Sequence, residues 1–544
     1  MKKLIIACLG LFYLVSCTDQ LRIDERQMAE DVTYGTSAKY LLAGSIDGIA
    51  QWYQRAGIRE DRHNAVVQYY QQLFSVKSQT YEEFSKAPEN WNTELELLKP
   101  VKAGLELAVI EGEPFIEGAL LVLKSFMFAY LTNQWGDVPY TDALRGREGI
   151  FFPKFDPQRE IYDGMLADLD RAIMLMESTS NYKEPQFDLI YSGNTAKWVK
   201  FANSLKIRLL VSSYEAYKKN GVDNGPKIGA IVSSGKYFTA VSDNAAYLYL
   251  GTANYNSWPL GYYNDNSGNE LTRRKPSTTF VNTLKTLNDP RLNGWIAPAL
   301  IPWANAAATV QVTDRYNFTY EVKQQDINGD TNGDGVPDGQ GNIEGYPVGE
   351  LYVGMPIGFG EGNPVRYGGT VPPAGAYDNY RTSSFGKLFV QDKSPLLKLT
   401  LLQACETNLS LAEAVQRGWI TGNAKTYYDN GVTLNMQRWD IPDAEITAYL
   451  ASLPVVLDGN NNLEKIATQK WLALFTVGIE AYFEYRRTKL PSVIGDAVPS
   501  GLGNDFPERW RYPTAEKDNN TDQYNEAVAR QGVDDQYTKI WILK

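Results

Sequence analysis

FIEGALLVLKSFMFAYLTNQWGDVPYTDAL, from Phe115 to Leu144, is the stretch that decides how the rest of the chain can fold. Its apolar and small side chains recur with the 3.6-residue period of a helix and form one broad face: Ile116, Ala119, Leu120, Leu123, Phe126, Met127, Tyr130, Leu131 and Trp135. Gly136 can end this helix, and Pro139 favours an extended backbone at Val138. A helix this apolar needs other helices to cover it, so we expect a scaffold of stacked helix pairs.

Similar helical patterns occur on both sides of this stretch. We predict further helices over residues 37–52, 65–74, 91–109, 160–177, 196–217, 226–234, 396–417, 424–436, 443–453 and 463–487. Asn194 and Thr195 are polar caps before one of them. Two antiparallel helices joined by a loop resemble a tetratricopeptide pair, although the connector after Leu144 is longer than a strict 34-residue repeat allows. The predicted fold is therefore mainly α, with a tetratricopeptide-like helical scaffold.

Residues 240–395 have a different composition. Helical periodicity is limited to Ser277–Leu287, while Gly, Asn, Pro, Tyr and Trp become common. A long excursion of this kind inside a compact chain is usually functional. We therefore predict a large, irregular, loop-rich lobe that binds the ligand, between an N-terminal helical scaffold at 37–239 and a C-terminal helical scaffold at 396–544.

Aromatic residues in this lobe are the candidate ligand-binding residues. They are Tyr255, Trp258, Tyr262, Tyr263 and Trp303. Aromatic faces suit the C–H surfaces of sugar rings, and Tyr or Trp can add a hydrogen bond. The alternative is that these rings, like Trp295, hold the lobe together.

An acidic, glycine-rich segment in the lobe is a candidate calcium site. Within QQDINGDTNGDGVPDGQGN, oxygen donors alternate with other residues over 326–338: Asp326, Asn328, Asp330, Asn332, Asp334 and Asp338. Counted from Asp330, Gly335 stands at position 6 as in an EF-hand, but position 12 is Gly341 and not the bidentate Glu. The segment is closer to the DxDxDGxxD loops of extracellular calcium modules. It predicts a structural Ca²⁺, and a plain Asp/Asn/Gly turn is the alternative.

The N-terminus reads as a secretory leader. Lys2 and Lys3 precede an apolar run from Leu4 to Val15, which is too short to span a membrane and typical of a signal peptide. Leu14, Val15, Ser16 and Cys17 resemble a bacterial lipobox. We therefore expect a signal peptide at 1–16, lipidation of Cys17 and a polar tether at 17–36; an ordinary leader with an incidental Cys is the alternative. No second apolar stretch approaches the length of a membrane span.

Composition restricts the chemistry. The net charge of −11 argues against a nucleic-acid partner, whose phosphates require a basic face. The single histidine, His63, would have to serve any Ser-His-Asp triad or His-ligated zinc site, and we expect it to be a solvated residue near a helix end. Glycosidase chemistry with paired carboxylates remains an alternative, because the chain has 64 acidic residues.

Seven segments, in their order and spacing, resemble the SusD/RagB family of outer-membrane nutrient-binding lipoproteins, in particular its second SusD-like branch. They are WGDVPYTDAL (135–144), DLDRAI (168–173), YSGNTAKWVKFANSLKIRLL (191–210), NDPRL (288–292), LAEAVQRGW (411–419), ATQKWLALFTVGIEAYFEYRRTKLP (467–491) and RWRYPTAE (509–516).

The resemblance implies a non-catalytic, lipid-anchored outer-membrane protein that faces the cell exterior. It further implies capture of a glycan for import through a SusC-like TonB-dependent transporter. A peptide-binding member of the same uptake system and a surface glycosidase are the alternatives. The matching motifs are scaffold motifs, so the resemblance assigns no ligand-binding residue.

Overall fold

The computed structural model describes residues 36–59, 61–73, 81–260, 273–329, 345–358, 364–369, 378–495 and 506–544. The predicted signal peptide, Cys17 and the tether up to residue 35 lie outside this part of the chain. So do six predicted site residues: Tyr262, Tyr263, Asp330, Asn332, Asp334 and Asp338.

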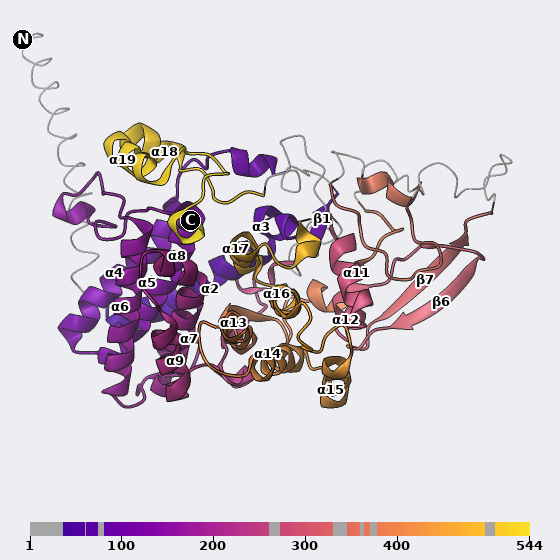
Figure 1. The fold of residues 1–544 in the computed structure, drawn as a ribbon, viewed down its shortest axis with the longest axis horizontal. Helices are drawn as coiled ribbons and strands as arrows, with labels where there is room; N and C mark the ends of the chain where they lie inside the picture. The colour runs from indigo at the N-terminus through magenta and orange to yellow at the C-terminus, as the bar shows by residue number, and fades with distance from the viewer. Residues whose placement is uncertain are drawn as a thin grey trace, which may run out of the picture.

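The N-terminal half is a set of long helices packed side by side (Figure 1). They are α2 (Ala38–Arg59), α4 (Asn92–Glu111), α5 (Pro114–Trp135), α6 (Gln158–Glu177) and α7 (Thr195–Ser212), followed by the shorter α8 (Tyr214–Lys219) and α9 (Gly225–Ser234). Consecutive long helices pack against each other as pairs, and α5 contacts α2, α4, α6 and α7. The fold is therefore mainly α with tetratricopeptide-like pairing, as predicted.

Helix α5 has the ends that its sequence predicts. Pro114 occupies the first turn, and the N–H of Gly136 donates to the carbonyl of Thr132 at 2.7 Å where the helix stops. Val138 is extended and forms a β-bridge with Asp156. By length and composition α5 could cross a membrane, so the expectation that no second stretch approaches a membrane span is wrong. However, 94% of the most apolar window of α5 is buried in the fold. It is the central core helix of the scaffold.

The C-terminal half adds a second group of helices. They are α13 (Ala404–Gln416), α14 (Ala424–Arg438), α15 (Asp443–Ala451), α16 (Asn462–Ala473), α17 (Gly478–Thr488), α18 (Thr514–Asn519) and α19 (Thr521–Gln531). Helix α13 packs on α7, α14 and α16, and α17 packs on α2 and on the short α3 (Asp61–Val66). The two helical halves therefore form one continuous scaffold.

Short strands and two small helices occur in the described part of the lobe. Its strands are β2 (Ala245–Leu248), β3 (Arg274–Pro276), β4 (Ile296–Ala297), β5 (Trp303–Ala304), β6 (Ala308–Thr313), β7 (Thr319–Asp326) and β8 (Ser384–Phe385). Two further strands, β1 (Tyr70–Gln72) and β9 (Lys398–Leu402), lie outside residues 240–395 and pair with strands of the lobe. The antiparallel pairs are β1–β3, β2–β9 and β4–β8, while β7 lies between a parallel β5 and an antiparallel β6. The helices are α11 (Thr278–Thr286) and α12 (Leu292–Trp295). The lobe lies at the end of the molecule away from α4–α6 (Figure 1).

Two predicted helices are partly strands. The helix predicted over 65–74 ends at Val66, because Gln68 adopts a positive φ of 61° and Tyr70–Gln72 pairs with β3. The helix predicted over 396–417 begins only at Ala404, because Lys398–Leu402 pairs with β2. Both strands obtain their backbone partners from distant segments, and a short apolar run does not distinguish a buried strand from a helix.

The helix predicted over 463–487 is interrupted. Helix α16 stops at Ala473, and Val477 has non-helical angles before α17 begins. The break places the ring of Phe475 against Phe280 at 4.8 Å and Trp295 at 5.0 Å between ring centroids. Packing of this ring against the lobe therefore outweighs the continuous helical pattern.

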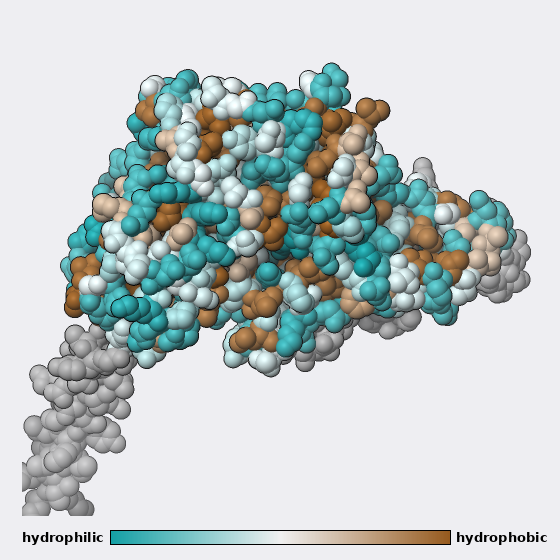
Figure 2. All heavy atoms as spheres, turned by 90° about the horizontal axis from the view of Figure 1, so that it is seen from below, coloured by the Kyte–Doolittle hydropathy of each residue, from teal (hydrophilic) through white to brown (hydrophobic). Residues whose placement is uncertain are grey.

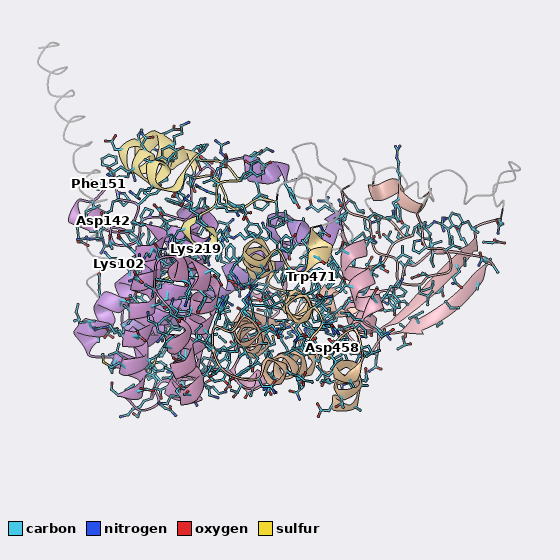
Figure 3. The ribbon with its side chains drawn as sticks, viewed as in Figure 1. Lys102, Asp142, Phe151, Lys219, Asp458 and Trp471 are labelled. Carbon is cyan, nitrogen blue, oxygen red and sulfur yellow. The ribbon has the colours of Figure 1, made fainter. Side chains whose placement is uncertain are left out.

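One large hydrophobic core runs through both helical halves and into the lobe. Trp471 lies among the central helices, whereas Phe151 lies at the edge of the helical half (Figure 3). Seen from below, hydrophobic residues on the surface form separate groups among hydrophilic and intermediate ones (Figure 2). Within the described residues, Trp303, Tyr346 and Val353 form a small separate core in the lobe.

Candidate functional site

Tyr255 is held at the tip of a closed loop that leaves its ring exposed. The Asn256 side-chain oxygen accepts from the N–H groups of Thr252 at 3.0 Å and Ala253 at 2.9 Å, and the N–H of Gly251 donates to the Asn256 carbonyl at 2.9 Å. The Asn256 side chain is buried beneath the loop, while Tyr255 is 66% exposed. These bonds fix the backbone of the loop, so little backbone freedom is left to lose on binding.

Two exposed aliphatic residues precede this loop in the chain. Leu248, at the end of β2, and Leu250 are both more than half exposed. The Nζ of Lys393 donates to the carbonyl of Leu250 at 3.2 Å and adds a cation beside them. Aromatic, aliphatic and hydrogen-bonding groups together suit a sugar, which has apolar C–H faces and polar edges.

Trp258 does not present a ring face as expected. It is only 1% exposed and packs edge-on against Tyr249 at 5.8 Å and against Phe389 at 6.2 Å between ring centroids. The apolar cavity beside it has a volume of about 20 Å³, which cannot hold a sugar. The prediction that Trp258 contacts ligand does not fit this burial, because side chains that include Tyr249 and Phe389 cover the ring.

Trp303 is also an internal residue. It is 2% exposed, its Nε1 donates to the carbonyl of Gly368 at 2.8 Å, and the Arg381 guanidinium lies 3.5 Å from its ring centroid. Trp295 is likewise buried, stacked 6.1 Å from Phe280. For Trp258 and Trp303 the structural alternative holds, and Tyr255 is the candidate among the described residues that has an exposed ring.

Two of the six predicted calcium ligands are described. Asp326 ends β7, and its Oδ1 accepts from the N–H of Asn328 at 2.9 Å, while its carbonyl accepts from Gly329 at 3.1 Å. This turn fits both the calcium loop and the plain Asp/Asn/Gly turn. No group of three or more His, Cys, Asp or Glu residues that could hold a metal occurs in the described part of the chain, and the other four predicted ligands lie outside it.

Sequence reasoning missed a groove of about 400 Å³ between α6, α7 and α9. Its floor is apolar and formed by Leu166, Ile173, Leu210 and Ile231. At its rim Lys236 pairs with Glu177 at 2.5 Å and Lys206 pairs with Asp170. The volume suits a small molecule, but these four charges already satisfy each other. The acidic residues of α6 and the lysines of α7 were the signal available in the sequence.

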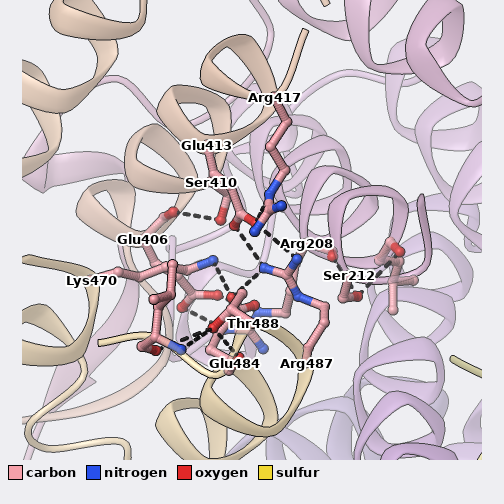
Figure 4. A network of polar contacts seen from close by, with 12 residues as sticks. Arg208, Ser212, Glu406, Ser410, Glu413, Arg417, Lys470, Glu484, Arg487 and Thr488 are labelled. Carbon is pink, nitrogen blue, oxygen red and sulfur yellow. Dashed lines mark hydrogen bonds and ion pairs between the residues drawn. The ribbon is translucent and has the colours of Figure 1, made fainter. Parts of the chain in front are cut away.

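A buried ion-pair network lies where α7, α13, α16 and α17 meet (Figure 4). Arg487 binds both oxygens of Glu413 at 2.8 and 2.7 Å and also contacts Glu484 at 2.6 Å, which Lys470 reaches at 2.9 Å. Burial raises the pKa of Glu413, but the nearby cations, Arg487 above all, outweigh it and lower the pKa to about 2. Such a carboxylate stays charged and holds the helices together.

A second part of the network crosses the scaffold. Arg208 on α7 donates to Glu406 on α13 at 2.5 Å and to Glu480 on α17 at 3.1 Å. The Tyr53 hydroxyl donates to Glu480 at 2.8 Å, and burial raises the pKa of Glu480. Helices from both halves of the sequence are therefore fixed relative to each other.

His63 is buried, not solvated as expected. Its Nε2 lies 3.4 Å from the side-chain oxygen of Gln134, and its ring stacks on Trp510 at 5.4 Å between centroids. The charged neighbours in the sequence suggested an exposed helix end, but α17 and Trp510 cover it.

Comparison with known proteins agrees with this architecture. The SusD-like_2 family, described as "Starch-binding associating with outer membrane", matches residues 30–329 and 346–513. Among curated proteins, none matches this chain.

Solved structures share the fold. A SusD homologue from Bacteroides fragilis NCTC 9343 aligns with a TM-score of 0.72 and 22% identity, over 94% of this chain and 100% of its own. A chitin-binding protein aligns with a TM-score of 0.68 and 24% identity, over 93% and 98% of the two chains. A chitin-binding SusD homologue from Flavobacterium johnsoniae aligns with a TM-score of 0.68 and 17% identity, over 92% and 98%.

The family match covers most of the chain, including every helix of the scaffold from α2 to α17. The motifs that suggested the resemblance lie within the matched residues, apart from the end of RWRYPTAE. The chain therefore belongs to the SusD-like_2 family, whose members are described as starch-binding and associating with the outer membrane.

Proposed function

We propose that this protein captures a glycan at the outer membrane and passes it, without cleaving it, to a SusC-like TonB-dependent transporter. The observation that carries the proposal is the family match over residues 30–329 and 346–513. The chitin-binding function of two structural neighbours supports a glycan rather than a peptide as the ligand. A peptide-binding role in the same uptake system is the second candidate.

The Tyr255 loop is the proposed contact surface. Its ring is exposed on a loop that internal hydrogen bonds hold closed, and the exposed Leu248 and Leu250 precede this loop in the chain. Stacking on one face and hydrogen bonds at the edge would bind a sugar ring without any chemical step.

Two buried acids of the scaffold are unsuited to glycosidase chemistry. A glycosidase needs one carboxylic acid with a raised pKa and a second carboxylate beside the substrate. Glu413 has its pKa lowered to about 2 and lies inside the scaffold with Arg487. Glu480 has a raised pKa, but it is buried between Tyr53 and Arg208, away from any surface a polysaccharide could reach.

Anchoring follows from the N-terminal sequence. We propose that acyl chains on Cys17 hold the protein on the outer membrane, facing the cell exterior, since two buried chains suffice for stable anchoring.

We also propose a structural Ca²⁺ in the segment 326–338. Its support is the alternating series of oxygen donors and the turn that Asp326 begins at the end of β7.

Co-purification tests the uptake role directly. The full-length protein is extracted with detergent from outer membranes, and proteins that stay bound are identified. We expect a large β-barrel partner with the wild type, and loss of the protein from the membrane fraction for Cys17→Ala. A wild-type protein that stays in the membrane without a barrel partner would contradict the proposal.

Titration distinguishes glycan binding from peptide binding and from glycoside hydrolysis. Starch and chitin oligosaccharides and a peptide pool are titrated into the purified protein, and new reducing ends are counted after long incubation. Saturable glycan binding with no new reducing ends supports the proposal. Binding of peptides alone supports the second candidate, and hydrolysis that one acid substitution abolishes would establish the glycosidase instead.

A further inference from the structure

Strand β6 is an open edge of the sheet in the lobe. In this sheet β7 lies between β5 and β6, and β6 is the outermost strand at its end of the molecule (Figure 1). The opposite edge is covered, because the carbonyl of Trp303 in β5 accepts from the N–H of Gly349 at 2.8 Å. The register of β6 with β7 is continuous from Ala308 to Thr313, without a bulge. An open, regular edge of this kind can pair with another strand.

The hydrogen bonds of β7 show which backbone groups of β6 point outward. The N–H of Lys323 donates to the carbonyl of Leu300 at 2.8 Å, on the side of β5. Because backbone groups of successive residues point to opposite sides of a strand, Val322 bonds to β6, where Val310 is its partner. The alternate residues of β6 point their N–H and C=O groups away from β7, and these groups have no partner among the described residues: Thr309, Gln311 and Thr313.

The edge has none of the usual features that block strand pairing. Residues 305–313 read NAAATVQVT and contain no charged residue, proline or glycine. The side chains of Thr309, Gln311 and Thr313 are exposed, while the two valines between them are half-buried on the other face. Natural edge strands are usually protected by lysine, proline or a bulge, so this unprotected and largely β-branched strand favours a partner.

The sequence of the strand is the same in both directions. From Thr309 to Thr313 it reads TVQVT, with Gln311 at the centre. Antiparallel pairing with β6 of a second copy therefore places identical residues opposite each other about a two-fold axis. Gln311 faces the same residue of the second copy, and Thr309 faces Thr313. These are the residues whose backbone groups point outward, so each pair can exchange two hydrogen bonds.

Packing and charge agree with this pairing. Val310 of each copy stands opposite Val312 of the other in a closely spaced pair, so the half-buried valines continue across the axis. Paired threonines can share a hydrogen bond, as the hydroxyl groups of Thr313 and Thr319 do within the chain at 3.1 Å. No charged residue of β6 meets its own copy. Glu321 lies on β7 beside Gln311, so the two β6 strands separate it from its copy.

We propose that β6 pairs with β6 of a second copy of this protein, antiparallel and centred on Gln311, so that one sheet joins two lobes. A pair of short strands buries much less than the roughly 1,200 Å² typical of stable interfaces, so the dimer is weak and depends on protein concentration. The proposal uses no residue of the Tyr255 loop and rests on neither the glycan nor the transporter.

Single cysteines test the register. Gln311→Cys, Thr309→Cys and Thr313→Cys are introduced into the full-length protein, which is oxidised in detergent and separated by electrophoresis without reductant. At the axis the two Cα atoms lie about 5.5 Å apart, within the range of about 4.4–6.8 Å for disulfides. The two copies of residue 313, like those of residue 309, are shifted by about 13 Å along the strands.

We therefore expect a disulfide-linked dimer for Gln311→Cys, and for a mixture of Thr309→Cys with Thr313→Cys, but not for either threonine variant alone. The wild type is the control, because Cys405 is buried. Equal dimer formation by all three single variants would overturn the proposal. Cross-linking of Gln311→Cys to a different protein and not to itself would also overturn it.

Proline tests the backbone pairing. The N–H of Gln311 points away from β7, so Gln311→Pro removes a donor from the proposed pair and none from the ladder between β6 and β7. Self-association is measured by sedimentation velocity over a range of protein concentrations. We expect Gln311→Pro to raise the dimer dissociation constant at least about tenfold, because both copies lose a hydrogen bond at the axis. Gln311→Thr keeps the N–H and should leave the constant unchanged.

A wild type that stays monomeric at every concentration would overturn the proposal, as would equal dissociation constants for Gln311→Pro and Gln311→Thr. If Gln311→Pro does not fold, the cysteine series decides. Neither measurement requires a glycan or a transporter. Failure of the proposed uptake function would therefore leave the dimer result unchanged.

Discussion

The helical scaffold and the lobe satisfy their polar groups in different ways. In the scaffold, buried charges pair across long distances in sequence, as when Arg208 binds Glu406 and Glu480. In the lobe, many polar side chains bond to their own loop: Asn256 caps residues 252 and 253, and Asp314 accepts from the N–H groups of Tyr316 and Phe318. Long-range pairing ties the scaffold helices to one another, whereas these local bonds hold individual loops of the lobe, which long-range pairs such as Lys275–Asp378 also connect.

This difference fits the division of roles. Under the proposed function, a scaffold that docks on a transporter would have to keep the relative positions of its helices, and a binding surface would benefit from loops that can change one at a time. The small core of Trp303, Tyr346 and Val353 is separate from the main core, so changes there need not reach the scaffold.

The largest loss of stability is expected from Arg208→Met. The change leaves Glu406 and Glu480 buried without their arginine, which costs about 3–5 kcal/mol. The free energy of unfolding is measured by urea titration with circular dichroism. As the control, Lys39→Met removes the exposed pair with Glu184 and should leave the free energy of unfolding unchanged. Equal effects of the two variants would show that long-range pairing does not hold the scaffold together.

Trp303→Ala should destabilise the lobe alone. Loss of the ring, its hydrogen bond to Gly368 and its contact with Arg381 costs about 3–5 kcal/mol locally. Amide exchange should rise in β5 and β7 while α5 stays protected, whereas Trp198→Ala in α7 should weaken protection of α5. Loss of protection in α5 on changing Trp303 would mean that the two regions unfold together.

Acid should weaken the scaffold through Glu413. Its pKa is about 2 in the folded protein and about 4.5 when unfolded, so its stabilisation is complete above pH 4.5 and is lost as the pH falls towards 2. The loss is about 3 kcal/mol. The free energy of unfolding should therefore depend less on pH between 4.5 and 2 in Glu413→Gln than in the wild type. Glu445→Gln, at an exposed acid, is the control, and an unchanged slope in Glu413→Gln would contradict the assignment.

Calcium removal should act on the lobe and not on the scaffold. If Ca²⁺ binds at 326–338, a concentration of about 100 times Kd stabilises by about 2.7 kcal/mol, and a chelator removes this gain. Asp326→Ala should abolish the chelator effect on the melting temperature. Asp458→Ala is the matched control, since Asp458 forms a similar turn with Asn460 in the scaffold (Figure 3). If the chelator does not change the melting temperature of the wild type, the plain Asp/Asn/Gly turn is the correct interpretation.

The smallest expected effect is on ligand affinity. Tyr255→Ala should weaken glycan binding by about 0.5–1.5 kcal/mol, the contribution of one ring contact, without changing the melting temperature. Tyr40→Ala removes an exposed tyrosine from α2 in the scaffold and should leave affinity unchanged. The two are compared by isothermal titration with the best oligosaccharide, and equal affinities would remove Tyr255 from the site.

The sequence alone determined the elements whose signals are local. Helix α5 follows from its apolar period and ends at Gly136, and Asn194 caps α7 by accepting from the N–H of Lys197 at 3.0 Å. Both depend on residues within one or two turns of each other, which a pattern can read. The family resemblance followed from the order of the scaffold motifs, which is also a property of the sequence.

Only the tertiary structure decided which residues are buried and what they pair with. Lys398–Leu402 became a strand because β2 supplies its partner, and Trp258, Trp303 and His63 are interior because distant segments cover them. The physical reason is the same in each case: burial and pairing depend on contacts between residues far apart in the chain, and no local pattern of side chains records them.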